Sequence, residues 1–196
     1  MKKKTVAFVL AMVLVFAVTV GVTVAYLTDK TDTIENTFTV GKVNITLAET
    51  FNTDTNNDNK PDAWQAQLIP GKEYLKDPVV TVLGGSEKCY LFVKFEEKNS
   101  PTTYLTYTSN LTGDKGWTQG DGTDIPENVW YRVVDKSATG TAFNLLDGNK
   151  VTIKNNVTND NMTEAAKAEL VYTAYACQYE GFENNAAGAW DAVKNA

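Results

Sequence analysis

The chain has 196 residues, with 18 Lys or Arg against 24 Asp or Glu, two cysteines and no histidine. The missing histidine excludes Ser-His-Asp and Cys-His nucleophiles, the H-E-x-x-H zinc protease helix and His-containing zinc fingers, and two cysteines are too few for a Cys-only zinc site. The net charge of −6 and the lack of a basic patch argue against nucleic-acid partners. We therefore expect a protein that is not an enzyme.

The N-terminal segment has the pattern of a secretory signal peptide. Three lysines at positions 2–4 form a positive n-region, and residues 5–24 contain no charged side chain. Small residues at Thr23 and Ala25 place signal cleavage after Ala25, so that the mature chain begins at Tyr26. The apolar run is also long enough to span a bilayer, and an uncleaved membrane anchor is the alternative.

Removal of residues 1–25 would leave residues 26–196, a length that suits a single domain. Because three lysines leave with the signal, the net charge would move from −6 to −9. No second apolar stretch of spanning length follows. The mature protein is therefore predicted to be secreted, with membrane contact only through the signal peptide before cleavage.

After the signal, short alternating or β-branched stretches are separated by Gly, Asn, Asp and Pro clusters, as is typical of strands joined by turns. Apolar residues of both parities in 89–95 predict a strand covered on both faces. Residues 163–170 and 185–193 have helical character. We predict an all-β fold, an antiparallel β-sandwich with one or two short helices. The expected strands are 38–47, 64–69, 78–82, 89–95, 104–107, 129–134, 142–146, 151–157 and 170–178.

Several segments resemble the TasA/camelysin family of Gram-positive exported proteins, which are processed by the SipW type of signal peptidase. The resemblance covers both ends and the middle of the chain and matches less clearly in residues 98–165. It rests on AYLTD at 25–29, NTFTVG at 36–41, VNITL at 43–47, LIPG at 68–71, KDPVVTV at 76–82, YLFVK at 90–94 and TAYACQ at 173–178.

The resemblance implies a jelly-roll-like sandwich that is exported to the cell surface or the biofilm matrix. It implies a signal peptidase of the SipW type as one partner, and self-association or co-assembly with related matrix proteins into fibres. Camelysins are described as metallo-endopeptidases, but this chain has no zinc-protease motif, and no catalytic residue can be carried over. A camelysin-like secreted endopeptidase and a calcium-dependent surface adhesin are the alternatives to a structural protein.

An Asp/Asn-rich loop has the spacing of a calcium site. Side-chain oxygens recur at loop positions one, three, five and nine, with a backbone carbonyl at position seven. Against calcium, Asn59 stands where a turn-forming glycine is usual, and Gln65 replaces a bidentate glutamate. A solvated loop without metal is the alternative, and no other cofactor is predicted. The candidate calcium ligands are Asp54, Asn56, Asp58, Lys60 and Asp62.

The two cysteines, Cys89 and Cys177, both lie in predicted strands. In an exported protein such a pair suggests a disulfide, which is possible if the two strands are neighbours. Free cysteines also behave as small buried hydrophobes, and this alternative stays equally open.

Two further groups of residues could suggest chemistry. Glu96 and Glu97 are paired acids, but adjacent strand positions point to opposite faces, which prevents them from meeting over one substrate. The aromatic residues Trp117, Trp130 and Tyr131 could form a carbohydrate-stacking platform, although aromatic residues in a sandwich more often belong to the core.

Signal cleavage would create a polar N-terminal arm, residues 26–37, with little apolar surface to hold it in place. Such an arm could pair with an exposed sheet edge of the next molecule, with Tyr26, Leu27 and Ile34 as apolar anchors. Because donor and acceptor surfaces differ, this contact would not close, and it predicts a filament. An arm that folds back onto its own sheet is the alternative.

Overall fold

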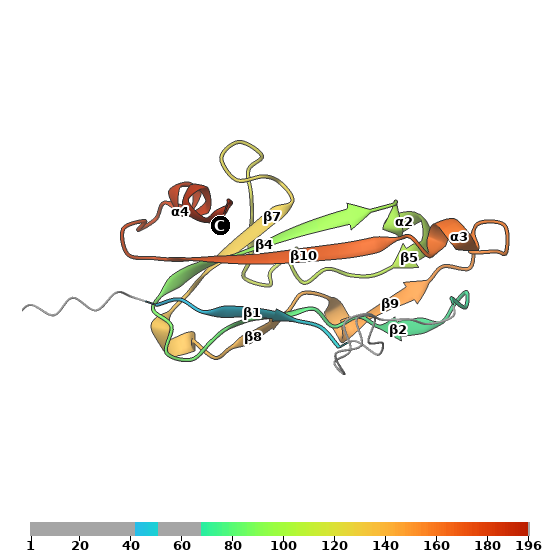
Figure 1. The fold of residues 1–196 in the computed structure, drawn as a ribbon, viewed down its shortest axis with the longest axis horizontal. Coiled ribbons are helices and arrows are strands. Elements are labelled where there is room, and N and C mark those ends of the chain that lie inside the picture. Colours follow the sequence, from blue (N-terminus) through green and yellow to red (C-terminus); the bar gives the residue numbers. More distant parts are fainter. Residues whose placement is uncertain (1–41, 51–67, 196) are drawn as a thin grey trace, which may run out of the picture. The chain divides into compact units, whose positions relative to one another are not determined.

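The computed structural model describes residues 42–50 and 68–195 of the chain (Figure 1). The chain divides into two units, residues 1–39 and residues 40–196, and every described residue belongs to the second unit. The described residues form ten strands in three antiparallel sheets, together with short helices. Among the described residues, no helix has both the length and the apolar character needed to cross a membrane.

The largest sheet has four strands in the order β10-β4-β7-β6. Its two long strands, β4 and β10, pair without interruption over ten positions, from Lys98 opposite Glu169 to Cys89 opposite Gln178. Aromatic, aliphatic and β-branched residues along both strands explain this length, because such side chains pack well on a pleated surface. The strands are β4 (Cys89–Lys98), β6 (Thr118–Gln119), β7 (Val129–Val134) and β10 (Glu169–Gln178).

Two three-stranded sheets, β1-β3-β8 and β2-β9-β5, pack against this sheet. Valines of β3 share a core with Leu91 and Val93 of β4, and Val151 and Ile153 of β9 share a second core with Leu170 of β10. The prediction of an all-β sandwich is therefore confirmed. The strands are β1 (Ile45–Ala48), β2 (Glu73–Leu75), β3 (Val79–Val82), β5 (Leu105–Thr106), β8 (Ala142–Asn144) and β9 (Lys150–Ile153).

Strand β4 is covered on both faces, as its sequence predicts. Leu91 and Val93 face the interior between the sheets, whereas Tyr90 and Phe92 face outward into a separate aromatic cluster. The helix α4 (Ala186–Val193) covers part of that outer face, where the buried Trp190 contacts Phe92 at a ring-centroid distance of 5.4 Å. Two hydrophobic layers thus hold the central strand, one on each side.

The predicted C-terminal helix is confirmed, since α4 begins after Asn185, whose side chain accepts a hydrogen bond from the Gly188 N–H at 2.9 Å. The helix predicted at 163–170 is wrong in its extent. Only α3 (Met162–Ala165) is helical, because Leu170 is buried as part of β10 and tertiary pairing outweighs local propensity. The remaining short helices are α2 (Pro101–Tyr104) and the 3-10 turns η1 (Lys136–Ala138) and η2 (Asp147–Asn149).

Candidate functional site: an open seam between two edge strands

Strands β1 and β10 lie at the edges of their sheets and next to each other across the interior (Figure 1). Within the described part of the chain, β1 pairs only with β3 and β10 pairs only with β4. We call this side of the sandwich the open seam, bounded by β1 and β10. The opposite side, where β8 faces β6 and β7, we call the closed seam.

The backbone of β10 points half of its polar groups away from the sheet. Phe95 of β4 lies opposite Tyr172, and its N–H bonds to the carbonyl of Asn128, away from β10. Directly after β10, the Tyr179 N–H bonds to the carbonyl of Lys88, toward the side of β4. Because N–H groups alternate in direction along an antiparallel strand, the odd-numbered residues of β10 pair with β4 and the even-numbered residues face the free edge. The free edge is therefore formed by the backbone of residues such as Tyr172 and Ala174.

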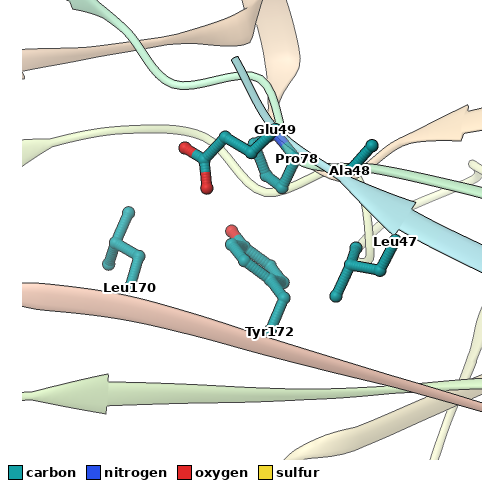
Figure 2. A pocket seen from close by; sticks show the side chains of 6 residues that line it. All are labelled: Leu47, Ala48, Glu49, Pro78, Leu170 and Tyr172. Carbon is teal, nitrogen blue, oxygen red and sulfur yellow. The ribbon is translucent and has the colours of Figure 1, made fainter. Parts of the chain in front are cut away.

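A cavity of about 320 Å³ opens between the two edge strands (Figure 2). Its walls are mostly apolar, and two groups supply oxygen atoms: the carboxylate of Glu49 and the hydroxyl of Tyr172, which points into the cavity. Pro78 is fully buried behind the cavity, whereas 39% of Leu47 is exposed at its rim. The residues that line it are Leu47, Ala48, Glu49, Pro78, Leu170 and Tyr172.

The Tyr172 hydroxyl is buried and has no hydrogen-bond partner among the described residues. Its ring stacks on Phe95 with the ring centroids 4.8 Å apart, so the side chain is held in place. Burial raises the pKa of the Tyr172 phenol, and the nearby groups Tyr107, Glu49 and Glu97 raise it further. The hydroxyl is therefore neutral at physiological pH, and it lies in a region of negative potential.

Glu97 reaches this region from β4, where it accepts a hydrogen bond from the Tyr107 hydroxyl. Burial and this bond both raise the pKa of the Tyr107 phenol. Glu96 instead pairs with Lys94 at 3.0 Å, so the two adjacent glutamates have different partners. The expectation that they do not act together on one substrate is consistent with this arrangement.

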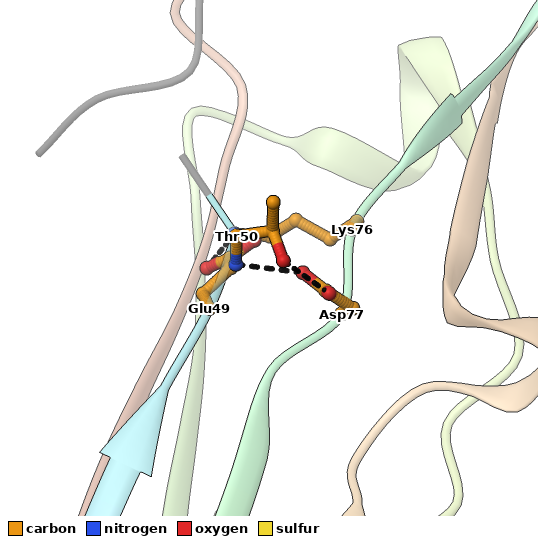
Figure 3. Close-up of polar contacts among 4 residues, drawn as sticks. All are labelled: Glu49, Thr50, Lys76 and Asp77. Atoms are coloured by element: carbon orange, nitrogen blue, oxygen red, sulfur yellow. Dashed lines mark hydrogen bonds and ion pairs between the residues drawn. The ribbon is translucent and has the colours of Figure 1, made fainter. Parts of the chain in front are cut away.

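A polar clasp joins the residues after β1 to those before β3 (Figure 3). Both carboxylate oxygens of Glu49 contact Lys76 Nζ, at 2.7 and 2.8 Å. Asp77 accepts two hydrogen bonds from Thr50, from the backbone N–H at 2.9 Å and from the hydroxyl at 2.7 Å. The clasp, formed by Glu49, Thr50, Lys76 and Asp77, thus fixes the Glu49 carboxylate at the mouth of the cavity.

The sequence-predicted calcium ligands and cleavage site lie outside the described residues, and both stay predictions. Between Lys42 and Thr50 and from Leu68 onward, no group of three or more His, Cys, Asp or Glu side chains gathers in a way that could hold a metal ion. The residues concerned are Asp54, Asn56, Asp58, Lys60 and Asp62 for calcium, and Ala25 and Tyr26 for cleavage.

Cys89 and Cys177 lie on neighbouring strands, as a disulfide would require, but both are free thiols. Cys177 is opposite Tyr90 in the pairing of β10 with β4, one position away from Cys89. The two side chains therefore point to opposite faces, Cys89 into the interior and Cys177 into the outer aromatic cluster. This geometry favours small buried hydrophobes over a disulfide. Burial raises the pKa of the Cys89 thiol to about 11.

The three aromatic residues considered as a carbohydrate platform do not share a surface. Trp130 is buried in the interior core, and Tyr131, the next residue of β7, faces the outer cluster. Trp117 lies at the closed seam, where its ring packs against Phe143 at 5.9 Å. A stacking platform built from these three residues is therefore wrong.

The closed seam is filled by the only arginine of the chain. The guanidinium of Arg132 lies over the rings of Phe143 and Trp117, with its central carbon 4.3 and 5.2 Å from their centroids. Burial lowers the pKa of Arg132, and its Nε atom is buried without a hydrogen-bond partner in the described part of the chain. Among the described residues, cation–π contacts are therefore the interactions that hold this guanidinium.

Sequence reasoning did not identify the cavity or the role of Tyr172. Alternation along 170–178 does place Leu170 and Tyr172 on one face, but pairing alone decides that β1 and β10 become neighbouring edges. No short motif carries that information. Comparison with protein-family models, curated proteins and solved structures finds no match for this chain.

Proposed function

We propose that this chain is an exported structural protein of the cell surface or of a biofilm-like matrix, and that it self-associates by strand addition. One observation carries the proposal: β10 is a ten-residue edge strand with one free side among the described residues. The signal-like N-terminus and the resemblance to the TasA/camelysin family support export and a matrix role.

Within the described part of the chain, the edge of β10 lacks the usual protection against pairing with another chain. Natural edge strands are commonly short, or carry lysine, proline or a bulge. In β10, pairing with β4 is uninterrupted over ten positions, and its only charged residue is Glu169 at the first position. An extended segment from a second molecule could therefore add its backbone hydrogen bonds along this edge.

The mature N-terminal arm, residues 26–37, is the segment proposed to be added. The contact would be head-to-tail, because the arm and the β10 edge are different surfaces, and it would extend into a filament. Export is tested first, by N-terminal sequencing of the protein recovered outside the cell. A sequence beginning at Tyr26 supports the proposal, and a chain that retains residues 1–25 contradicts it.

Assembly is tested by blocking the free edge. Ala174→Pro removes a backbone N–H that points away from β4, so it should disturb the pairing of β4 with β10 little while it disrupts strand addition. Ala174→Ser keeps the N–H and is the matched control. Light scattering and electron microscopy should show filaments for the wild type and for Ala174→Ser, and shorter or no filaments for Ala174→Pro.

Deletion of residues 26–34 tests the donor side of the same contact. Filaments that persist without the arm would contradict strand addition by this segment. Monomers in all samples, including the wild type, would contradict self-association itself. Circular dichroism of each variant checks that the sandwich remains folded.

A further inference from the structure

We propose that the cavity of the open seam binds an alkylammonium group, such as a lysine side chain of a partner or a small free amine. The cavity combines apolar walls with two groups whose oxygen atoms can accept hydrogen bonds, the Tyr172 hydroxyl and the Glu49 carboxylate. The proposal concerns side-chain chemistry inside the cavity, and it goes beyond assembly through the backbone of β10.

The oxygen atoms favour a donor over an acceptor. The Tyr172 hydroxyl can donate as well as accept and lacks a partner in the described part of the chain, whereas the Glu49 carboxylate can only accept. An ammonium group carries three N–H donors and no acceptor, which suits a phenol oxygen beside a carboxylate. A ligand carboxylate would instead meet Glu49 at the mouth of the cavity and be repelled.

The charges around the cavity also favour a cation. Glu49 and Glu97 both raise the pKa of the Tyr172 phenol, as negative neighbours do. Lys76 offsets the charge of Glu49, because both oxygens of Glu49 contact its Nζ. Glu97 is a further carboxylate that acts on the Tyr172 hydroxyl, and an added ammonium group would compensate for this negative charge.

The walls explain why the cation should carry an alkyl chain. Leu47 and Pro78 form one side and Leu170 the other, so methylene groups entering between them would be removed from water. Each buried methylene group should tighten binding by about fourfold. The cavity volume of about 320 Å³ is large enough for a chain of four or so carbons with its ammonium group.

The test uses the exported chain, labelled with 15N and kept at a concentration at which light scattering shows monomers. n-Butylammonium, n-butanol and butyrate are titrated separately at pH 7, and amide shifts are followed by NMR. Saturable shifts at Ala48, Glu49 and Leu170 are expected with butylammonium, at least fivefold weaker binding with butanol and none with butyrate. Equal binding of butanol and butylammonium, or no saturation with butylammonium up to about 100 mM, would overturn the proposal.

Two matched variants locate the interaction. Tyr172→Phe removes the hydroxyl oxygen and should weaken butylammonium binding about tenfold, as expected for a hydrogen bond to a charged group. Tyr175→Phe makes the same chemical change outside the cavity lining, at a ring that packs on Trp190, and should leave the affinity unchanged. Equal affinities of Tyr172→Phe and the wild type would contradict the assignment.

The source of the ammonium group is distinguished with two peptide models. Nα-acetyl-lysine N-methylamide presents the lysine side chain as a protein would, and its Nε-acetylated form has no charge. Tighter binding of the lysine derivative than of butylammonium would assign the site to a partner's lysine, and weaker binding would assign it to a free amine. Retention of binding after Nε-acetylation would overturn the proposal for either source. Assembly is measured separately by light scattering, so a failure of self-association can be distinguished from a failure of ammonium binding.

Discussion

The two seams of the sandwich are closed by different means. At the closed seam, Arg132 fills the space between Trp117 and Phe143, and the three side chains contact one another. At the open seam, β1 contributes Leu47 and Ala48, which are exposed, and a cavity remains above Tyr172. Large, flat side chains can seal an edge that backbone pairing leaves open, whereas small and exposed ones leave room for a ligand or a strand.

The comparison also separates two ways of satisfying polar groups. The Arg132 guanidinium is held against aromatic rings, which compensate in part for the water that it has lost. The Tyr172 hydroxyl is also buried but has no such compensation among the described residues. A buried polar group without a partner is unfavourable for stability, and it marks the open seam as the place where an external group would be stabilising.

The largest expected effect comes from truncating one apolar side chain at each seam. Phe143→Ala should lower the free energy of unfolding by about 2–3 kcal/mol, because it removes a half-buried ring together with its contacts to Arg132 and Trp117. Leu47→Ala at the open seam should cost less than about 1 kcal/mol, since Leu47 is 39% exposed. Urea denaturation of both variants measures the difference. Equal losses would mean that the two seams do not differ in packing.

As the pH rises, the stability contribution of Cys89 in the interior should be lost before that of Tyr172 at the open seam. Cys89 has its pKa raised from about 9 to about 11 in the folded state, so the folded protein holds this proton more tightly than the unfolded chain. Its contribution to stability is complete below pH 9 and is lost as the pH rises through about 11. One pKa unit corresponds to about 1.4 kcal/mol, and a loss of that order is expected between pH 9 and pH 10.

The same series of pH values includes one control variant for the interior and one for the open seam. Cys89→Ala should flatten the loss of stability between pH 9 and 11, whereas Tyr172→Phe should alter it only above pH 10, where tyrosines of the unfolded chain ionise. Denaturant midpoints measured at one-unit intervals give the comparison. Identical profiles for Cys89→Ala and the wild type would contradict the burial of a neutral thiol.

The sequence predicts the strands better than it predicts how they come together. The two-sided burial of β4 and the C-terminal helix follow from local patterns, because alternation and capping are encoded within a few residues. The helix predicted at 163–170 is too long because good helix formers there are drawn into β10 by pairing with β4. Neither seam is visible in the sequence, since each depends on strands that are far apart along the chain.

The clasp beside the open seam should make a smaller contribution to the free energy of unfolding. Asp77→Ala removes both acceptors of Thr50, and since these groups are exposed, the free energy of unfolding should fall by about 1 kcal/mol. Thr50→Ser keeps the backbone N–H and the hydroxyl and should change it by less than about 0.5 kcal/mol. Thermal unfolding of both variants checks this order. A larger loss for Thr50→Ser than for Asp77→Ala would contradict the pairing shown in Figure 3.

The smallest expected effect has the opposite sign and is specific to the open seam. Tyr172→Phe removes a buried hydroxyl that has no partner among the described residues while it keeps the ring stacked on Phe95. Because the hydroxyl loses water on folding and gains no hydrogen bond in return, its removal should raise the free energy of unfolding by about 0.5–1 kcal/mol.

Tyr107→Phe is the matched comparison, since the Tyr107 hydroxyl donates to Glu97 and its removal leaves that acceptor unpaired. This variant should lose about 1 kcal/mol, so the two substitutions should move the urea midpoint in opposite directions. A loss of stability in Tyr172→Phe would mean that the hydroxyl already has a hydrogen-bond partner in solution, such as bound water. The contrast between a closed seam whose buried cation lies on aromatic rings and an open seam whose buried hydroxyl has no such contact among the described residues would then not hold.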